Sequence, residues 1–178
     1  MTHAILQAAT FAAEKHADQR RKGKRQEPYI NHLLEVAELV SSVAERDENL
    51  IIAALLHDVV EDAGVTFDEL AERFGTDVAA LVAEVTDDKS LPKVERKRLQ
   101  IVSAPHKSPR AQILKLADKI SNLRSMLNSP PADWNEARRR EYFDWASQVV
   151  AGLTAPNQQL KREFDQLVRE FDAALVRA

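Results

Sequence analysis

The chain of 178 residues fits one ordinary domain with a substantial core, and its 44% apolar and 30% charged residues are typical of a soluble globular protein. It contains no cysteine, which excludes disulfides, thiolate nucleophiles and cysteine-ligated zinc or iron. A formal net charge of −3 argues against a general nucleic-acid binder, whose binding surface is usually basic.

The N-terminal half of the chain carries the periodicity of amphipathic helices. Apolar residues at helical spacing predict a first helix over residues 3–18, followed by the basic loop RRKGKRQEP. The segments YINHLLEVAELVSSVAE and ENLIIAALLHDVVED predict a second and a third helix. The N-terminus lacks the regions of a signal peptide, and no stretch approaches about 18 apolar residues, so we expect a cytoplasmic protein without a membrane span.

Helix punctuation is clear in the next segment, TFDELAERFG. Thr66 and Glu69 form a capping-box pattern, and Gly75 stands where a helix C-cap belongs. Thr76 is predicted to cap the following helix, DVAALVAEVTDD.

The remaining segments also predict helices. Prolines near the starts of LPKVERKRLQIVSA and PRAQILKLADKISNLRSML indicate two helix N-termini. After the loop NSPPADWNE, two closing helices are expected at about 133–153 and 156–175. Only four glycines and no alternating β pattern are present. We therefore predict an all-α fold, a single helical-bundle domain over residues 1–178 with about eight or more helices.

An abrupt change of polarity marks the segment ALLHDVVEDAG. In one continuous ideal helix, His57, Asp58, Glu61 and Asp62 share a sector that is apolar one and two turns upstream. A solvated helix face would normally stay polar along its length, and buried charges need partners. The pattern therefore favours a cleft in which these side chains surround a cation or perform chemistry, and the alternative is an exposed helix end.

Two other polar residues are ambiguous when taken alone. His32 shares an apolar helix face with Val36 and Leu39, and such a histidine is more often a hydrogen-bonded core residue than a metal ligand. Asp118 lies opposite the apolar positions of its helix, so periodicity predicts a solvated aspartate. Periodicity cannot bring these segments together in space.

The order of these residues resembles the H…HD…D metal-binding pattern of the HD-domain phosphohydrolases. Six segments in the same order resemble the hydrolase domain of RelA/SpoT enzymes, in particular the stand-alone small alarmone hydrolases of the metazoan SpoT homologue type. These segments are HADQRRKG, PYINHLLEVA, ALLHDVVEDAGVT, EVTDDKSLPKVERKRLQ, ILKLADKISNLR and EYFDWASQVVAGL. The resemblance runs from about residue 3 to residue 160 and implies the HD-domain fold.

Members of that family hydrolyse the 3′-pyrophosphate of guanosine tetra- or pentaphosphate alarmones and use manganese. The resemblance implies one Mn²⁺ per chain, although two imidazoles and two carboxylates also suit other divalent cations. The implied ligands are His32, His57, Asp58 and Asp118. It also implies that Glu61 and Asp62 position or deprotonate the attacking water, and which of them is the base stays open.

The polyanionic substrate requires cations at the cleft. The loop between the first two helices supplies five cations in six residues, a run that by itself is usually a solvated connector. The resemblance implies that two of these cations and three later residues contact the substrate. The implied contacts are Arg21, Lys22, Lys93, Asn122 and Tyr142.

Two departures and two alternatives accompany the resemblance. The long RelA/SpoT proteins continue into a synthetase domain, whereas this chain leaves no room for one, so we expect it to degrade the alarmone and not to make it. The loop residues GKRQ differ from the acidic, glycine-containing loop of some relatives.

The alternative functions are a phosphohydrolase acting on another nucleotide, such as a 2′- or 3′-phosphorylated cofactor, and an alarmone- or metal-sensing module without turnover. The expected partner is a guanine nucleotide, with no nucleic acid and no membrane, and the oligomeric state stays open.

Overall fold

The structure is a computed structural model that describes residues 2–176, and these residues form ten α-helices and one 3₁₀ helix without a β-strand. The elements are α1 (Thr2–Lys15), α2 (Ile30–Ala44), α3 (Glu48–Leu56), α4 (Val59–Ala63), α5 (Phe67–Phe74), α6 (Thr76–Val85), α7 (Lys93–Ser103), η1 (Ala104–His106), α8 (Pro109–Asn128), α9 (Glu136–Ala151) and α10 (Gln158–Val176). The predicted all-α fold of eight or more helices is confirmed. None of the described helices has the length and apolar character needed to cross a membrane.

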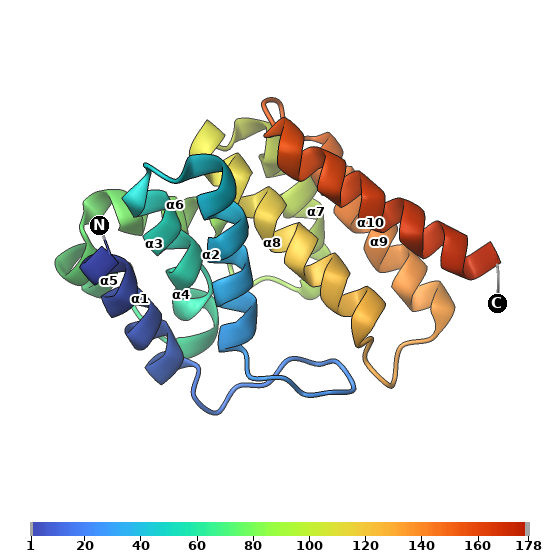
Figure 1. The fold of residues 1–178 in the computed structure, drawn as a ribbon, viewed down its shortest axis with the longest axis horizontal. Coiled ribbons are helices and arrows are strands. Elements are labelled where there is room, and N and C mark those ends of the chain that lie inside the picture. Colours follow the sequence, from blue (N-terminus) through green and yellow to red (C-terminus); the bar gives the residue numbers. More distant parts are fainter. Residues whose placement is uncertain (1, 177–178) are drawn as a thin grey trace.

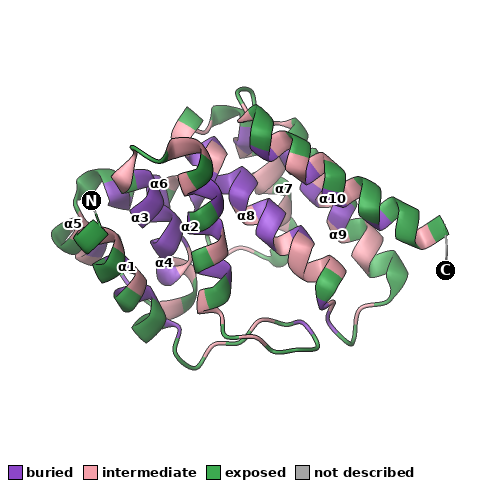
Figure 2. Cartoon of the chain, viewed as in Figure 1, coloured by how far each residue is buried: buried purple, intermediate pink, exposed green. Residues whose placement is uncertain are grey.

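Two helices form the centre of the packing. Every residue of α3 from Leu50 to Leu56 is buried, because this segment is apolar on all its faces. The long helix α8 runs between α2 on one side and α10 on the other (Figure 1). Half of the residues of α8 are buried as well, and polar residues are among them (Figure 2). Several polar residues on α8 are therefore placed inside the molecule and not in bulk water.

The third predicted helix is broken where its polarity changes, which corrects the assumption of a continuous helix. α3 ends at Leu56 and α4 begins at Val59. The ring of His57 donates a hydrogen bond to the carbonyl of Ala54 at 2.7 Å. In a continuous helix, that carbonyl would accept from the backbone N–H of Asp58. At the break, Asp58 lies 3.6 Å from His32 of α2, and His57 lies 3.8 Å from Asp118 of α8.

The predicted helix ends are mostly confirmed. Thr66 Oγ1 accepts a bond from the N–H of Glu69 at 3.1 Å, and Gly75 ends α5 with a φ of 93°. The predicted cap at Thr76 is wrong, because Thr76 is already the first residue of α6 and makes no capping bond with its side chain. The two closing helices are present, and α9 begins at residue 136 because the side chain of Asn135 caps it.

The loop of residues 16–29 passes along the end of the bundle where α2 begins (Figure 1). α7 differs from the other long helices, because none of its residues is buried. It packs on α9 and η1 at the edge of the bundle. The buried core is thus bordered by this loop and by α7, which are more exposed.

Candidate metal centre and adjoining cleft

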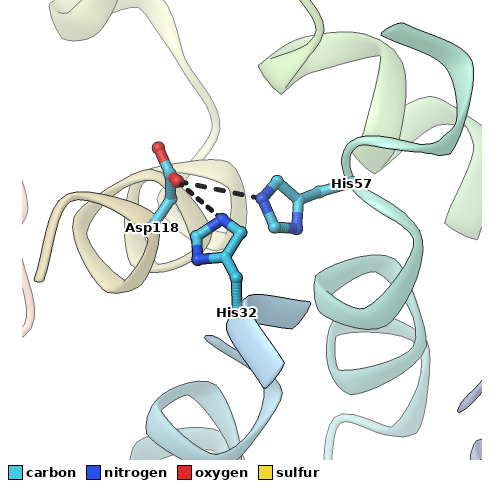
Figure 3. Close-up of side chains that lie close together, drawn as sticks. All are labelled: His32, His57 and Asp118. Carbon is cyan, nitrogen blue, oxygen red and sulfur yellow. Dashed lines mark ion pairs between the residues drawn. The ribbon is translucent and has the colours of Figure 1, made fainter. Parts of the chain in front are cut away.

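Four side chains from three separate segments converge in the core. His32 lies on α2, His57 and Asp58 lie at the α3–α4 break, and Asp118 lies on α8. Donor atoms of His32, His57 and Asp118 all lie within 4.8 Å of one another, and the three side chains point toward a common centre (Figure 3). Asp58 Oδ2 lies 3.2 Å from His57 Nε2 and 3.6 Å from His32 Nε2. The four residues that resemble HD-domain ligands are therefore brought together by the fold.

The hydrogen bond of the His57 ring fixes its tautomer. Its Nδ1 faces the carbonyl of Ala54 at 2.7 Å, and a carbonyl can only accept, so Nδ1 carries the proton. In the neutral ring, Nε2 then has a free lone pair. This atom is buried and has no hydrogen-bond partner among the described residues. In its neutral form, His57 thus directs a metal-ligating lone pair to the side on which Asp58 and Asp118 lie.

A second hydrogen-bond chain fixes the tautomer of His32. Ser121 Oγ donates to a carboxylate oxygen of Glu35 at 2.6 Å, because a carboxylate accepts. The same hydroxyl must then accept from His32 Nδ1, which lies 2.8 Å away. The Nε2 lone pair of His32 therefore also points inward, 3.4 Å from Asp118 Oδ1.

These donors fit a divalent cation. The chemistry is that of two imidazole nitrogens and two carboxylates, a set suited to Mn²⁺, Zn²⁺ or Fe²⁺. Both imidazoles donate, through Nδ1, the outer hydrogen bond that orients metal-binding histidines. Burial favours the neutral ring, but the carboxylates of Asp58 and Asp118 outweigh it and raise the pKa of His57 to about 10. A cation at this centre would take the place of that proton.

The catalytic candidates lie beside the four donors. A cavity of about 160 Å³ is lined by all four donors together with Glu61 and Asp62 of α4. Burial, followed by the charges of Asp58 and Asp87, raises the pKa of the Glu61 carboxyl. Asp62 accepts a bond from Gln19 and is paired with Lys89. The two carboxylates therefore line the same cavity as the four donors, as general acid–base help to a bound water molecule requires.

Three polar residues that line the cavity were not identified as site residues from the sequence: Tyr29, Lys115 and Lys119. The hydroxyl of Tyr29 donates to Asp58 Oδ2 at 2.6 Å, and its aromatic position beside a helix start carried no distinctive signal. Lys115 and Lys119 are buried on α8, where lysines are ordinarily taken to mark a solvent face. Lys119 Nζ lies 3.1 Å from Asp118 Oδ2, so it is also part of the centre.

The cavity opens into a larger cleft of about 520 Å³. All five residues that were expected to contact substrate line this cleft: Arg21, Lys22, Lys93, Asn122 and Tyr142. Arg21 Nη2 donates to Asn122 Oδ1 at 2.9 Å, and Asn122 Nδ2 donates to Asp118 Oδ1 at 2.7 Å. The cleft is thereby linked to the metal centre by direct hydrogen bonds.

The basic loop contributes only part of its charge to the cleft. Arg20, Arg21 and Lys22 line it, whereas Lys24 and Arg25 do not. The description as a solvated connector therefore applies to the second half of the loop. The cleft is also lined by α7, with further cations, and by three aromatic residues, Trp134, Tyr142 and Trp145.

Comparisons with known proteins agree with this arrangement. Residues 8–155 match the HD-domain family model. The chain is 52% identical over 167 residues to the guanosine-3′,5′-bis(diphosphate) 3′-pyrophosphohydrolase MESH1 of Mus musculus and 50% identical over 167 residues to that of Homo sapiens, with 93% of each chain covered in both cases. It is also similar to a solved metazoan orthologue of SpoT described as hydrolysing ppGpp, with a TM-score of 0.90 and 46% identity over 94% of this chain and 95% of that one. The chain therefore belongs to the HD-domain family, and within that family it is similar to the MESH1 group of metazoan SpoT orthologues.

Proposed function

We propose that this protein hydrolyses the 3′-pyrophosphate of guanosine tetra- and pentaphosphate, giving GDP or GTP and pyrophosphate. The observation that carries the proposal is a small cavity with four inward metal donors that opens directly into a cation-lined cleft. Hydrolysis of a nucleotide with a pyrophosphate on its ribose needs both the cavity, where a metal would act on the pyrophosphate, and the cleft, where the rest of the anionic nucleotide would bind. The activity named for the similar MESH1 proteins supports the same substrate.

The cation would be held by His32, His57, Asp58 and Asp118, and the proposed metal is one Mn²⁺ per chain. When bound, such an ion lowers the pKa of water and offsets charge on the phosphoryl oxygens. The choice of manganese rests on the family resemblance, since the donor set also suits other divalent cations.

Glu61 and Asp62 would handle the proton of the attacking water. The water oxygen forms a bond to the phosphorus attached to the ribose 3′-oxygen, and the bond between that phosphorus and the 3′-oxygen breaks. The 3′-oxygen leaves with a proton, and the two phosphates depart together as pyrophosphate. Tyr29 would hold Asp58 through its 2.6 Å bond, and burial of the centre excludes bulk water from the donors.

Arg21, Lys22, Lys93, Asn122 and Tyr142 would bind the nucleotide in the cleft. The Arg21–Asn122–Asp118 chain of hydrogen bonds offers a route by which nucleotide binding orients the metal centre. The cytoplasmic location, the single-domain organisation and the absence of nucleic-acid and membrane partners stay predictions.

The test is to incubate purified protein with manganese and guanosine tetraphosphate and to identify the products by chromatography. GDP and pyrophosphate, both abolished by a chelator and restored by manganese, are the expected result. The same assay is run with deoxynucleotides and with cofactors that carry a 2′- or 3′-phosphate. If kcat/KM is higher for one of these compounds than for the alarmone, that compound is the preferred substrate. If the alarmone binds and no compound is turned over, the protein is a sensor.

A further inference from the structure

The connection between the cavity and the cleft is a narrow mouth with its own chemistry. Six residues line both spaces and therefore define this mouth: Tyr29, Glu61, Asp62, Asp87, Gln100 and Asn122. The cavity of about 160 Å³ corresponds to roughly five water molecules at about 30 Å³ each. It has room for one phosphate group beside the metal donors but not for a nucleotide. With one phosphate beside the metal donors, a second phosphate on the same phosphorus that is directed away from the donors lies at the mouth.

Two cations stand at this mouth, on the cleft side. Lys89 comes from the loop between α6 and α7, and Arg96 comes from α7. Lys89 pairs with Asp62 and lies 3.9 Å from Glu61 Oε1, while Arg96 Nη1 lies 3.6 Å from the same oxygen. Their side chains are 47% and 25% exposed, so both remain accessible to a ligand.

The placement of Arg96 belongs to a wider feature of α7. Its cleft-lining residues are spaced as one helix face: Lys93, Arg96, Lys97 and Gln100. No residue of α7 is buried, so this face does not serve the core. The other side of the helix carries an ordinary exposed pair, in which Arg98 bonds Glu95 at 2.6 Å. α7 thus turns a cationic stripe toward the cleft.

We propose that Lys89 and Arg96 form the subsite for the terminal phosphate of the pyrophosphate that is removed, and that they make the enzyme select a diphosphate ester over a monophosphate ester. The inference rests on the proposed function. The attacked phosphorus lies beside the metal donors, and the terminal phosphate, which stays attached to it throughout the reaction, lies at the mouth. Its oxygens pair with Lys89 and Arg96 in place of Glu61 and Asp62. These two carboxylates are then free to act on water.

The test compares guanosine 5′-diphosphates that carry either a 3′-diphosphate or a 3′-monophosphate. The measured quantity is the ratio of the two kcat/KM values. Both compounds depend on Glu61 and Asp62, so disturbance of these carboxylates cancels in the ratio. Lys89→Met and Arg96→Met are each expected to lower the ratio by about tenfold or more, the usual scale of a charge-assisted hydrogen bond. Arg98→Met removes the same charge from the outer side of α7 and should leave the ratio unchanged.

A second arm varies the 5′ end while the 3′-diphosphate is kept. If the variants change the preference between 5′-monophosphate and 5′-diphosphate and not the 3′ preference, the two cations serve the other end of the nucleotide and the inference is overturned. An unchanged 3′ ratio in both variants, with alarmone still hydrolysed, also overturns it and leaves the proposed function intact.

A binding measurement tests the subsite without catalysis. Calorimetry with the manganese-loaded protein gives the affinities for pyrophosphate and for orthophosphate. The wild type is expected to bind pyrophosphate more tightly, and Lys89→Met and Arg96→Met should each remove about tenfold of that difference. Equal affinities for the two anions in the wild type would contradict the subsite, even for a protein that turned over no alarmone.

Discussion

The metal centre and the cleft are built in opposite ways, although they adjoin. The donors of the centre lie on packed helices or at the break between α3 and α4, and His32 and His57 are only 2% and 5% exposed. The cleft is walled by an exposed loop and by α7, which buries no residue. The centre therefore depends on geometry that the core enforces, whereas the cleft depends on charges that water and salt can screen. Under the proposed function, the chemistry takes place in the buried part, and the anion is captured in the exposed part.

α8 joins the two regions. It carries Asp118 toward the centre, and one turn later it carries Asn122 toward the cleft. Asn122 bonds both Asp118 and Arg21, so one side chain touches both environments. Substitutions in the two regions should consequently separate metal binding and turnover from KM.

Loss of a donor should have the largest effect. Asp58→Ala removes a carboxylate that lies near both Nε2 atoms. We expect the metal content to collapse and turnover to fall by more than about 100-fold, since even residues that only orient ligands account for about 10- to 100-fold. Metal analysis and the alarmone assay check this. Asp68→Ala, at an exposed position of α5, is the control, and full metal content in Asp58→Ala would rule out Asp58 as a ligand.

Glu61→Gln should separate chemistry from metal binding inside the same cavity. The amide keeps the shape but cannot accept a proton, so turnover should fall by about 100-fold or more while metal stays bound. Because burial and nearby carboxylates raise the pKa of Glu61, wild-type activity should decline on the acidic side at a higher pH than an ordinary glutamate would give. The variant should lack that acidic limb. Parallel losses of metal and rate would make Glu61 a ligand or a structural residue.

Substitution of Lys115 measures the free-energy cost of a buried charge beside the metal centre. Its ammonium is buried and bonds the carbonyl of Val85 at 3.3 Å, and burial followed by the charge of Lys119 lowers its pKa to about 8. An unfolded lysine titrates near about 10.4, so the unfolded chain binds more protons between the two values and stability rises with pH there. At pH 7 the charged lysine costs up to about 3 kcal/mol relative to a neutral group.

Lys115→Met should therefore be more stable than the wild type at pH 7, and the gap should close as the pH rises from about 8 to about 10.4. Urea unfolding of the metal-free proteins at several pH values measures the gap. Lys161→Met is the control, because Lys161 pairs with Asp165 at 2.6 Å near the surface. A gap that does not vary with pH would show that the buried charge is not the cause.

The sequence predicted features that depend on neighbours along the chain. Helix ends followed from Thr66 and Gly75, and the polarity change at His57 marked the site. Asp118 shows what local periodicity missed. Its helix was expected to expose one face, but α8 lies between α2 and α10 and is buried on several sides. Polar residues such as Lys115 made this helix look exposed in the sequence. Their burial follows from the packing of α8 between α2 and α10, which the sequence pattern does not show.

The smallest predicted effect belongs to the cleft, where Arg21 and Lys22 face the proposed nucleotide site. Replacing both with alanine should raise KM by about tenfold and flatten its salt dependence, because exposed charges are screened over a Debye length of about 8 Å near physiological salt. Metal content should not change, and kcat should move much less than KM if these groups bind the ground state and the transition state equally. KM measured at low and high salt checks this.

The same loop supplies a matched control for that variant. Lys24 and Arg25 carry the same charge but do not line the cleft, and Arg25 lies 3.9 Å from Glu27. Their double alanine variant should keep the wild-type KM at both salt concentrations. Arg21→Lys keeps the charge and loses the planar fork that bonds Asn122, so it should recover the salt dependence but not the full affinity. If both double variants behave alike, net charge alone attracts the substrate, and the cleft has no specific contact at Arg21 and Lys22.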